Sequence, residues 1–257
     1  MNGNTITRSY IHFILALLTL LFISACSSVP QVEGDKPEPA YFDSARTVSD
    51  DHDFVLADVY DPWEGFNRTM YRFNYRADRY VLLPVIEGYQ YVTPELMQDG
   101  IHNFFENIRE ITTFINSLLQ LELTKSYQTA GRFLTNSTVG LLGTIDVASY
   151  WGIPKHREDF GQTMGYWGSG SGPYLVLPLL GPSSVRDSIG LGVDSIVMSN
   201  LRDQLNMKWE EELIWDALNA VDTRSNITFR YYQTGSPFEY ELVRKLWTAK
   251  RQLDVEK

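Results

Sequence analysis

The chain is poor in the residues that form disulfides and bind metals: its 257 residues include one cysteine and four histidines. With only Cys26 available, no internal disulfide can form, which excludes a secreted disulfide scaffold. His102 and His156, the two histidines beyond the N-terminal segments, have no cysteine nearby and no second histidine at metal-ligand spacing. The sequence therefore predicts no metal site.

The glycine-rich stretch 161–172 lacks the usual motifs of catalysis and cofactor binding. No serine in it has glycine two residues before and two after, so the G-x-S-x-G nucleophile elbow is absent. Pro173 occupies the last glycine position of G-x-G-x-x-G, and no Walker A sequence occurs. Asp146 and Asp159, acids in apolar or glycine-rich surroundings, are better explained by structural hydrogen bonds. We expect no enzyme and no cofactor, and we assign the glycines to tight turns and close packing.

Clustered positive charge is also missing. The formal net charge is −10, with 22 Lys and Arg against 32 Asp and Glu. Proteins that bind nucleic acid need clustered Lys and Arg, so nucleic acid is excluded as a partner. A polybasic patch would gain ~1 kcal/mol per charge on an anionic lipid surface, but the sequence contains no such patch. Any membrane contact must therefore be apolar or covalent.

The apolar run Ile11–Phe22 is too short for a transmembrane helix, which needs ~20 residues. Arg8 precedes this run and small residues close it, which is the layout of a secretory signal. The segment that follows, Ile23-Ser24-Ala25-Cys26, resembles the bacterial lipobox. The alternatives are an ordinary signal peptide with a chance cysteine, or a free buried thiol.

The lipobox resemblance implies cleavage just before Cys26 and attachment of acyl chains, palmitate among them. Each buried CH₂ adds ~0.8 kcal/mol, so two or three chains anchor a protein firmly. An Asp after the cysteine favours retention at the inner membrane, whereas this chain has Ser27. The resemblance therefore implies a lipid-anchored protein on the periplasmic face, or inner leaflet, of the outer membrane.

Composition divides the chain into four segments. We expect a lipoprotein signal peptide (1–25), a lipidated N-terminus with an acidic flexible tether (26–59), a helical domain (60–225) and a charged C-terminal helix or tail (226–257). The tether is rich in Pro, Asp and Glu and has too little apolar content to fold alone. At ~5 to 6 Å × √n, its mean reach is ~30 Å, so the folded part can lie against the membrane.

Helical periodicity dominates the rest of the chain and predicts a mainly α fold with short extended connectors. The first helix is expected to have Asp61 as its N-cap, and a second to start at Thr93 and to end or kink near Gly100. Residues 136–148 look like a bent hairpin, and 173–182 like an extended connector. Further helices are expected over 101–119, 124–134, 183–199, 208–221 and 228–253, the last charged and solvated.

A broad apolar and aromatic stripe follows the helix expected over 101–119. On local pattern alone, such a stripe is better explained as core than as a lipid-facing surface. Its prominent members are Phe104, Phe105, Ile108, Ile111, Phe114 and Ile115.

Several short blocks, taken in order, closely resemble the MlaA (VacJ) lipoprotein family. Any one block is weak, but the ordered set after a lipobox is specific. Met164 stands where leucine is expected, and the tether is longer and more acidic than expected. The blocks are Asp61-Pro62-Trp63-Glu64-Gly65-Phe66-Asn67-Arg68, Tyr71-Arg72-Phe73-Asn74, Asn103-Phe104-Phe105-Glu106-Asn107, Arg132-Phe133-Leu134-Thr135-Asn136, Gly143-Thr144-Ile145-Asp146, Asp159-Phe160-Gly161-Gln162-Thr163-Met164-Gly165, Gly172-Pro173-Tyr174-Leu175-Val176-Leu177-Pro178 and Arg186-Asp187.

The resemblance implies an outer-membrane component that removes mislocalised phospholipid from the outer leaflet and so maintains lipid asymmetry. It implies a ring-like bundle of amphipathic helices lying in the membrane, with a central amphipathic channel. Implied partners are phospholipid, a trimeric porin and the soluble periplasmic carrier MlaC, which receives the lipid in retrograde transport. No covalent chemistry is implied.

The resemblance also assigns residues to the lipid pathway. The aromatic stripe, from Phe104 to Ile115, becomes a candidate membrane-facing surface rather than core. Residues 136–152 resemble a helical hairpin beside the channel. The candidates for the channel and hairpin are Phe73, Asn74, Asn136, Gly140, Gly143, Thr144 and Asp146.

Two other classes of protein compete with this hypothesis. A membrane-anchored phospholipase would act on the same lipids, but it needs an activated nucleophile, which the absent G-x-S-x-G motif and the scarce histidines disfavour. A structural lipoprotein that braces porins or the envelope is the second alternative. Release of free fatty acid from phospholipid would identify the enzyme, and intact lipid asymmetry with altered porin assembly in a mutant would identify the structural lipoprotein.

Overall fold

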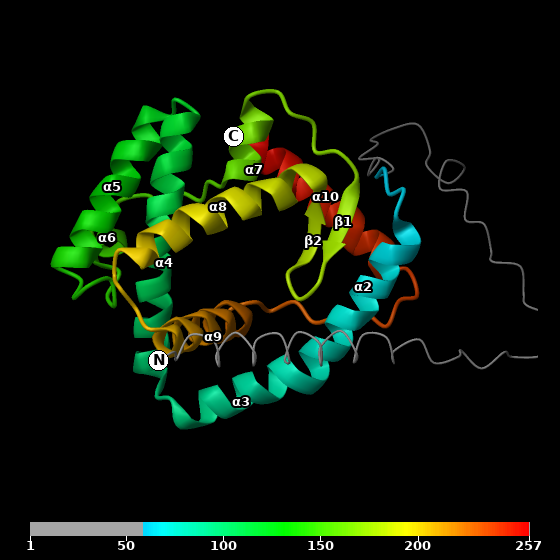
Figure 1. The fold of residues 1–257 in the computed structure, drawn as a ribbon, viewed down its shortest axis with the longest axis horizontal. Helices are drawn as coiled ribbons and strands as arrows, with labels where there is room; N and C mark the ends of the chain where they lie inside the picture. The colour runs from blue at the N-terminus through cyan, green and yellow to red at the C-terminus, as the bar shows by residue number, and fades with distance from the viewer. Residues whose placement is uncertain (1–58, 257) are drawn as a thin grey trace, which may run out of the picture. The chain divides into compact units, whose positions relative to one another are not determined.

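The computed structural model describes residues 59–256, which are mainly helical, as predicted (Figure 1). The proposed signal peptide, Cys26 and most of the tether lie outside the described residues. The elements are α2 (Glu64–Ala77), the π-helix η1 (Asp78–Leu82), α3 (Leu83–Val92), α4 (Glu95–Leu119), α5 (Leu123–Thr138), α6 (Val147–Tyr150), α7 (Phe160–Tyr166), β1 (Tyr174–Leu177), β2 (Gly181–Ser184), α8 (Val185–Asp203), α9 (Trp209–Ser225) and α10 (Glu239–Glu256).

α2, η1 and α3 form one continuous helical path along one side of the described unit (Figure 1). The π-helical turn lies directly before Pro84, which occupies the start of α3. Proline has no backbone N–H to donate, and a widened turn is a common accommodation at such a point. The path therefore changes its hydrogen-bonding pattern without breaking.

The start of the first helix differs from the prediction. Trp63, not Asp61, is the N-cap residue of α2, and it makes no side-chain cap hydrogen bond. Asp61 instead accepts hydrogen bonds from Asn67 Nδ2 at 2.7 Å and from Arg244 at 3.0 Å. The Tyr240 hydroxyl also donates to Asp61. The carboxylate thus joins the two ends of the folded sequence rather than capping the nearer helix.

The second expected helix is longer than predicted. α4 begins at Glu95 and continues through Gly100 to Leu119, so the break expected at Gly100 is wrong. An isolated glycine weakens a helix by only ~1 kcal/mol relative to alanine, which packing easily offsets. α4 packs along much of its length against α5, its antiparallel neighbour (Figure 1).

Residues 173–184 form a small antiparallel hairpin in place of the expected connector. β1 pairs with β2, with Tyr174 opposite Ser184 and Leu177 opposite Gly181. Ser184 then caps α8, accepting a hydrogen bond from the backbone N–H of Asp187 at 3.1 Å, as predicted for this helix start. Pro173, Pro178 and Pro182 are compatible with a two-stranded hairpin, because both of its strands are edge strands.

The apolar core lies where this hairpin meets α2 and α10. Tyr71, Tyr174, Val176 and Tyr240 form it, and the tyrosine rings meet edge to face. The C-terminal helix was expected to be solvated and to start at Thr228. It starts at Glu239 and buries one face in the core, because Tyr240 fills the space beside Tyr71. No helix within residues 59–256 is long and apolar enough to cross a bilayer.

Candidate functional site

The interior of the described unit is unusually polar. Among residues 59–256, buried polar and charged side chains outnumber buried hydrophobic ones, while many large hydrophobic side chains are exposed. α4 shows this inversion most clearly, because its buried face is its polar face. The buried side chains of α4 are Phe105, Glu106, Asn107, Glu110, Thr113, Asn116 and Ser117.

The predicted membrane-facing stripe lies mostly between this interior and the surface. Phe104, Ile108, Ile111, Phe114 and Ile115 are each half-buried. Phe105 is buried at 4% exposure. The rings of Phe104 and Phe105 both contact the ring of Trp215 on α9, at centroid distances of 5.4 and 5.3 Å respectively. Phe105 therefore has protein neighbours, and lipid contact by the other five stays a prediction.

Arg132 of α5 is the centre of the polar interior beside α4. Its side chain is 1% exposed and donates to Glu110 at 2.8 Å and to both carboxylate oxygens of Asp146 at 2.9 Å. It also donates to the backbone carbonyl of Ile153 at 2.8 Å. Asn136 adds a hydrogen bond to Asp146 at 2.9 Å. The Arg132 guanidinium thus connects α4, α5 and residues 146–153.

Asp146 has a structural role in this network. It caps α6 by accepting from the backbone N–H of Ser149. Burial raises its pKa, but hydrogen bonds from Ser149, Asn136 and Arg132 outweigh burial and lower the pKa to about 2. The expectation of structural hydrogen bonds for Asp146 is confirmed, and any part in a channel wall is additional to that role.

The α5–α6 hairpin, residues 136–148, is tightly packed at two glycines: within itself at Gly140 and against α4 at Gly143. A Cβ on Gly140 would lie 2.2 Å from the carbonyl oxygen of Ile145, and one on Gly143 would lie 2.7 Å from the Asn107 side chain. Gly143 also has φ +91°, which side chains rarely adopt. At the tip, Leu141 and Leu142 have positive φ and are exposed.

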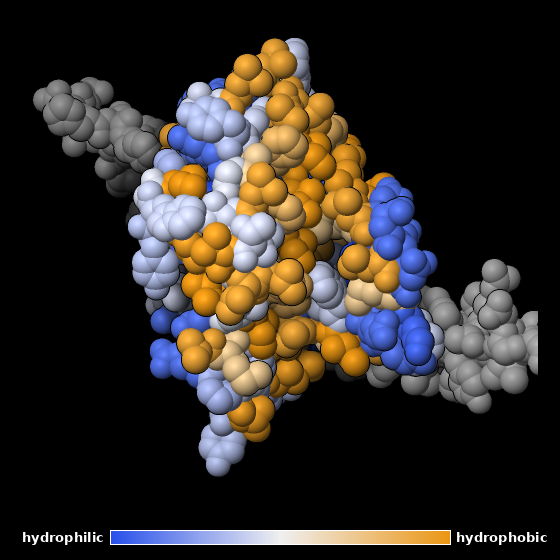
Figure 2. All heavy atoms as spheres, turned by 90° about the vertical axis from the view of Figure 1, so that its left-hand side faces the viewer, coloured by the Kyte–Doolittle hydropathy of each residue, from blue (hydrophilic) through white to orange (hydrophobic). Residues whose placement is uncertain are grey.

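Exposed apolar side chains continue from this tip across α4, α5 and α6. Figure 2 shows the resulting hydrophobic band, which runs the length of that face with hydrophilic surface on either side. Large exposed apolar patches mark contact with lipid or with another protein. The contributing residues include Leu118, Leu119, Leu121, Leu123, Leu134, Val139, Leu141, Leu142 and Ile145.

The structure separates Phe73 and Asn74 from the other channel and hairpin candidates. Asn74 is buried in α2 and holds the β-hairpin, donating to the carbonyl of Leu177 at 2.9 Å and accepting from the N–H of Leu179 at 2.7 Å. Phe73 is half-buried on the same helix. Asn136, Gly140, Gly143, Thr144 and Asp146, by contrast, cluster around the α5–α6 hairpin.

A charged cavity of about 460 Å³ opens between α4, residues 153–159, α8 and α9. On its wall the buried Glu106 carboxylate receives three cations: Lys155 at 2.7 Å, Arg157 at 2.6 Å and Arg109. Burial raises the pKa of Glu106, but the Lys155 hydrogen bond and the charges of all three cations lower it to about 2. Three cations thus contact this one carboxylate, in a cavity whose lining holds six Asp or Glu and four Lys or Arg side chains in all.

An apolar groove of about 560 Å³ lies beside the charged cavity. Phe105 and Trp215 line both the charged cavity and this groove. Among the sequence candidates, Thr144 and Phe104 also border the groove. Leu96, Met97, Ile101, Ile214 and Leu218 supply most of its remaining surface.

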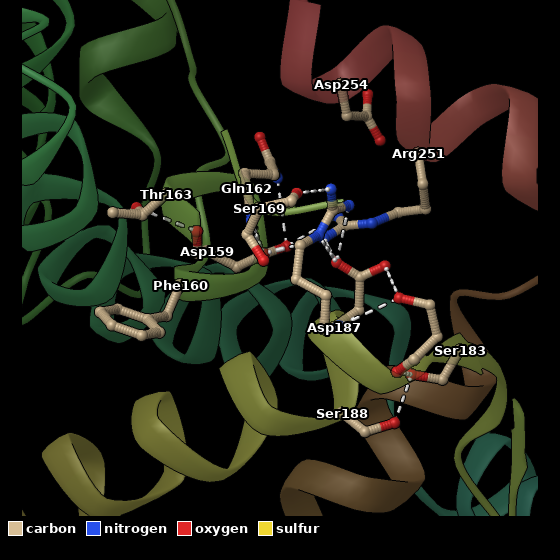
Figure 3. Close-up of polar contacts among 12 residues, drawn as sticks. Asp159, Phe160, Gln162, Thr163, Ser169, Ser183, Asp187, Ser188, Arg251 and Asp254 are labelled. Carbon is tan, nitrogen blue, oxygen red and sulfur yellow. Dashed lines mark hydrogen bonds and ion pairs between the residues drawn. The ribbon is translucent and has the colours of Figure 1, made fainter. Parts of the chain in front are cut away.

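A second ion-pair cluster fixes the C-terminal helix. Arg251 of α10 reaches between Asp159, which caps α7, and Asp187 in the first turn of α8 (Figure 3). The distances to the two carboxylates are 2.8 and 2.7 Å. Burial raises the pKa of Asp159, and the Arg251 hydrogen bond and charge reverse this to a net lowering. The structural role expected for Asp159 is confirmed.

Close packing explains at least one of the glycines in the 161–172 stretch. A Cβ on Gly190 of α8 would lie 2.3 Å from the backbone nitrogen of Gly161 on α7. The two helices therefore meet backbone to backbone at these positions. The expectation that glycine serves close packing here is confirmed.

Sequence reasoning missed the charged cavity. Glu106, Arg109, Lys155, Arg157 and Trp215 were not among the candidates. A usable signal was present, since buried polar residues of α4 at 106, 110, 113 and 117 recur with helical spacing opposite the apolar stripe. The contribution of residues 155 and 157 came from an irregular segment, where spacing carries no such information.

A helical fold with a polar interior, an apolar exterior and adjacent charged and apolar chambers defines a protein suited to amphipathic lipid. The chain belongs to the MlaA lipoprotein family, whose model matches residues 59–254. This family is associated with the outer membrane. Among residues 59–256 no group of three His, Cys, Asp or Glu side chains is arranged to hold a metal ion.

Individual relatives agree with the family assignment. The intermembrane phospholipid transport system lipoproteins MlaA of Shigella flexneri and Escherichia coli are each 34% identical over 174 residues, 65% of this chain and 66% of theirs. An uncharacterized protein of Rickettsia felis is 39% identical over 130 residues, 51% of this chain and 52% of its own. The chain thus matches about half the length of that rickettsial relative.

A solved structure is also similar. A chain from work on the structural basis for maintenance of bacterial outer membrane lipid asymmetry aligns with a TM-score of 0.62 and 28% identity. The alignment covers 76% of this chain and 98% of that chain. The likeness therefore includes nearly the whole of the solved chain.

Proposed function

We propose that this protein removes mislocalised phospholipid from the outer leaflet of the outer membrane and passes it towards the periplasm, which maintains lipid asymmetry. The observation that carries the proposal is the inverted distribution of side chains, polar inside and apolar outside. The related MlaA proteins are named for intermembrane phospholipid transport, which supports the same function.

The physical basis is the cost of moving a headgroup through hydrocarbon. A charged or polar headgroup loses its hydration there, and a polar wall replaces part of it. An apolar exterior lets the helices lie in the membrane interface around that wall. The exposed band on α4, α5 and α6 is suited to this position (Figure 2). In this proposal the helices surround an amphipathic channel.

The anchor, the partners and the site residues belong to the same proposal. Acyl chains on Cys26 hold the protein at the periplasmic face, a trimeric porin associates with it, and the carrier MlaC receives the lipid. Asn136, Thr144 and Asp146 contribute polar channel wall, Gly140 and Gly143 let the hairpin bend, and Phe73 and Asn74 set the geometry at the first helix. Transport involves no covalent catalysis.

Labelling of surface-exposed phospholipid in a deletion strain tests the function. We expect the deletion to raise outer-leaflet phospholipid and detergent sensitivity, and the full-length gene to restore both. Asp146→Leu, expressed at normal levels, is expected to restore neither fully. Unchanged lipid asymmetry with altered porin assembly would instead support a structural lipoprotein.

A second assay separates transport from hydrolysis. Purified protein incubated with phospholipid is expected to release no free fatty acid. Release that is abolished by a single Ser→Ala change would establish a phospholipase and overturn the proposal.

A further inference from the structure

Two cavities of opposite character share one aromatic wall. The charged cavity and the apolar groove are both lined by Phe105 of α4 and Trp215 of α9. Phe104 packs edge to face on both rings, at centroid distances of 5.5 Å to Phe105 and 5.4 Å to Trp215. Phe105 and Trp215 therefore border both the charged cavity and the apolar groove, and Phe104 lies on the groove side.

The cluster of cations around Glu106 in the charged cavity has the chemistry of a phosphate subsite. Arg109, Lys155 and Arg157 converge on a single carboxylate, Glu106, which cannot neutralise all three. Their side chains are 38%, 34% and 71% exposed, which leaves Lys155 and Arg157 accessible to a ligand. Arg109 also donates to Asn219 and Thr223 and so is the most engaged of the three. Arginine and lysine donors of this kind bind phosphate strongly through charge-assisted hydrogen bonds.

The other acidic side chains of this cavity, and Arg202, also have partners. Glu110 pairs with Arg132 at 2.8 Å. Glu158 pairs with Lys125 at 3.0 Å, Asp159 pairs with Arg251, and Arg202 pairs with Asp216. Asp194 receives hydrogen bonds from Asn116 and from the backbone of Phe160. The cluster around Glu106 is thus the place in this cavity where cations exceed the anions they contact.

The groove beyond the wall has the size and lining of a site for a hydrocarbon chain. Its volume is about 560 Å³, within the usual range for ligand pockets, and its surface is almost wholly apolar. Leu96, Met97 and Ile101 of α4 face Ile214 and Leu218 of α9 across it. An apolar chain gains free energy by leaving water for such a surface.

We propose that one phospholipid occupies both chambers, with its phosphate held by Arg109, Lys155 and Arg157 and an acyl chain in the groove behind Phe105 and Trp215. This inference rests on the proposed lipid-transport function and assigns its substrate site. A ligand with both a phosphate and a hydrocarbon chain fits the pair of chambers, whereas free phosphate or an uncharged lipid fits only one. The pair of chambers thereby selects lipids that carry a phosphate.

Photocrosslinking of the purified full-length protein in detergent tests the proposal. The two probes are a phosphatidylethanolamine and a diacylglycerol that carry the same diazirine acyl chain. We expect the phospholipid probe to crosslink to Met97, Ile101 or Ile214. Lys155→Gln with Arg157→Gln should lower its yield about fivefold, since a combined loss of ~1 kcal/mol from two partly exposed ion pairs is about a fivefold change in binding. Diacylglycerol yield should stay unchanged, which also reports that the groove is folded.

Two further variants complete the test. Arg72→Gln with Arg79→Gln removes the same charge from exposed positions of α2 and η1 and should change neither yield. Arg157→Gln alone, at a side chain 71% exposed, should fold normally and lower the phospholipid yield about twofold. Equal losses with both probes, or equal crosslinking over the exposed band of α5 and α6, would overturn the shared site.

The cell assay distinguishes failure of this inference from failure of the function. If the Lys155/Arg157 variant restores lipid asymmetry fully while the wild-type gene also does, only the phosphate subsite is wrong. If the wild-type gene itself fails to restore asymmetry, the transport function is wrong.

Discussion

Arg132 holds two carboxylates in the interior, and its loss would leave both without a counter-ion. Glu110 is buried and Asp146 is mostly buried, so breaking these pairs should be costly. We expect Arg132→Met to lower the free energy of unfolding by about 3–5 kcal/mol, as is typical when one partner of a buried ion pair is removed. Thermal unfolding in detergent, followed by near-UV circular dichroism, measures this change.

Arg68 provides the control for that variant. It pairs with Glu64 and Glu241 at the surface, where the side chain is 37% exposed. Arg68→Met should change stability by no more than ~1 kcal/mol. Similar losses in the two variants would contradict the importance assigned to the buried network.

Glu106 makes a second residue-scale prediction, for stability against pH. Its pKa of about 2 lies below the ordinary value of 4.5, so the folded state binds its proton less readily than the unfolded state. The resulting stabilisation is complete above about pH 5 and is lost as the pH falls towards 2. Glu106→Gln should be less stable at neutral pH, and the difference from wild type should shrink in acid. A difference in unfolding temperature that is constant from pH 7 to pH 3 would contradict this assignment.

At the scale of elements, the α5–α6 hairpin is positioned by glycine contacts. Gly143→Ala places a Cβ 2.7 Å from the Asn107 side chain and also strains a backbone with φ +91°. We expect the hairpin to shift away from α4 and the variant to complement a deletion strain poorly in detergent-sensitivity tests. Gly152→Ala has φ +74° but no atoms within 4 Å, so it isolates backbone strain from the clash. Equal defects in the two variants would show that the contact with Asn107 is unimportant.

Elements with strong helical periodicity could be predicted from the sequence, and their packing could not. The start of α8 at Ser184 follows from local capping chemistry, because serine is a preferred N-cap residue and can be recognised in the sequence. Asp61 has the same local chemistry, but its carboxylate accepts hydrogen bonds from Tyr240 and Arg244 of α10 instead of capping α2. The C-terminal helix was expected to be solvated because it carries many charges, but Tyr240, Val243 and Trp247 turn one of its faces into the core.

The candidate site was predictable only where its residues are close together in the sequence. The glycines and acids of the hairpin form a compact sequence block, so they were found together. The charged cavity draws on α4, the irregular segment 153–159, α8 and α9, which only the fold brings together. The apolar stripe was recognised, but the direction it faces depends on which side of α4 meets α5, and periodicity does not specify that.

At the scale of the whole molecule, an apolar exterior predicts membrane association that does not depend on the lipid anchor alone. We expect Cys26→Ser to mislocalise yet still partition into membrane or detergent through its exposed hydrophobic side chains. Fractionation followed by detergent phase separation measures this. A fully soluble, monomeric variant would contradict an embedded position for residues 59–256 while leaving the lipobox resemblance intact.

The polar interior has a calorimetric consequence. Unfolding raises the heat capacity through newly exposed apolar surface and lowers it through newly exposed polar surface, by roughly +0.45 and −0.26 cal/K/mol per Å². Because the buried side chains of residues 59–256 are predominantly polar, scanning calorimetry in detergent should give less than the usual ~12–15 cal/mol/K per residue. A small heat-capacity change flattens the curve of unfolding free energy against temperature. The free energy of unfolding should therefore fall only slowly on cooling as well as on heating.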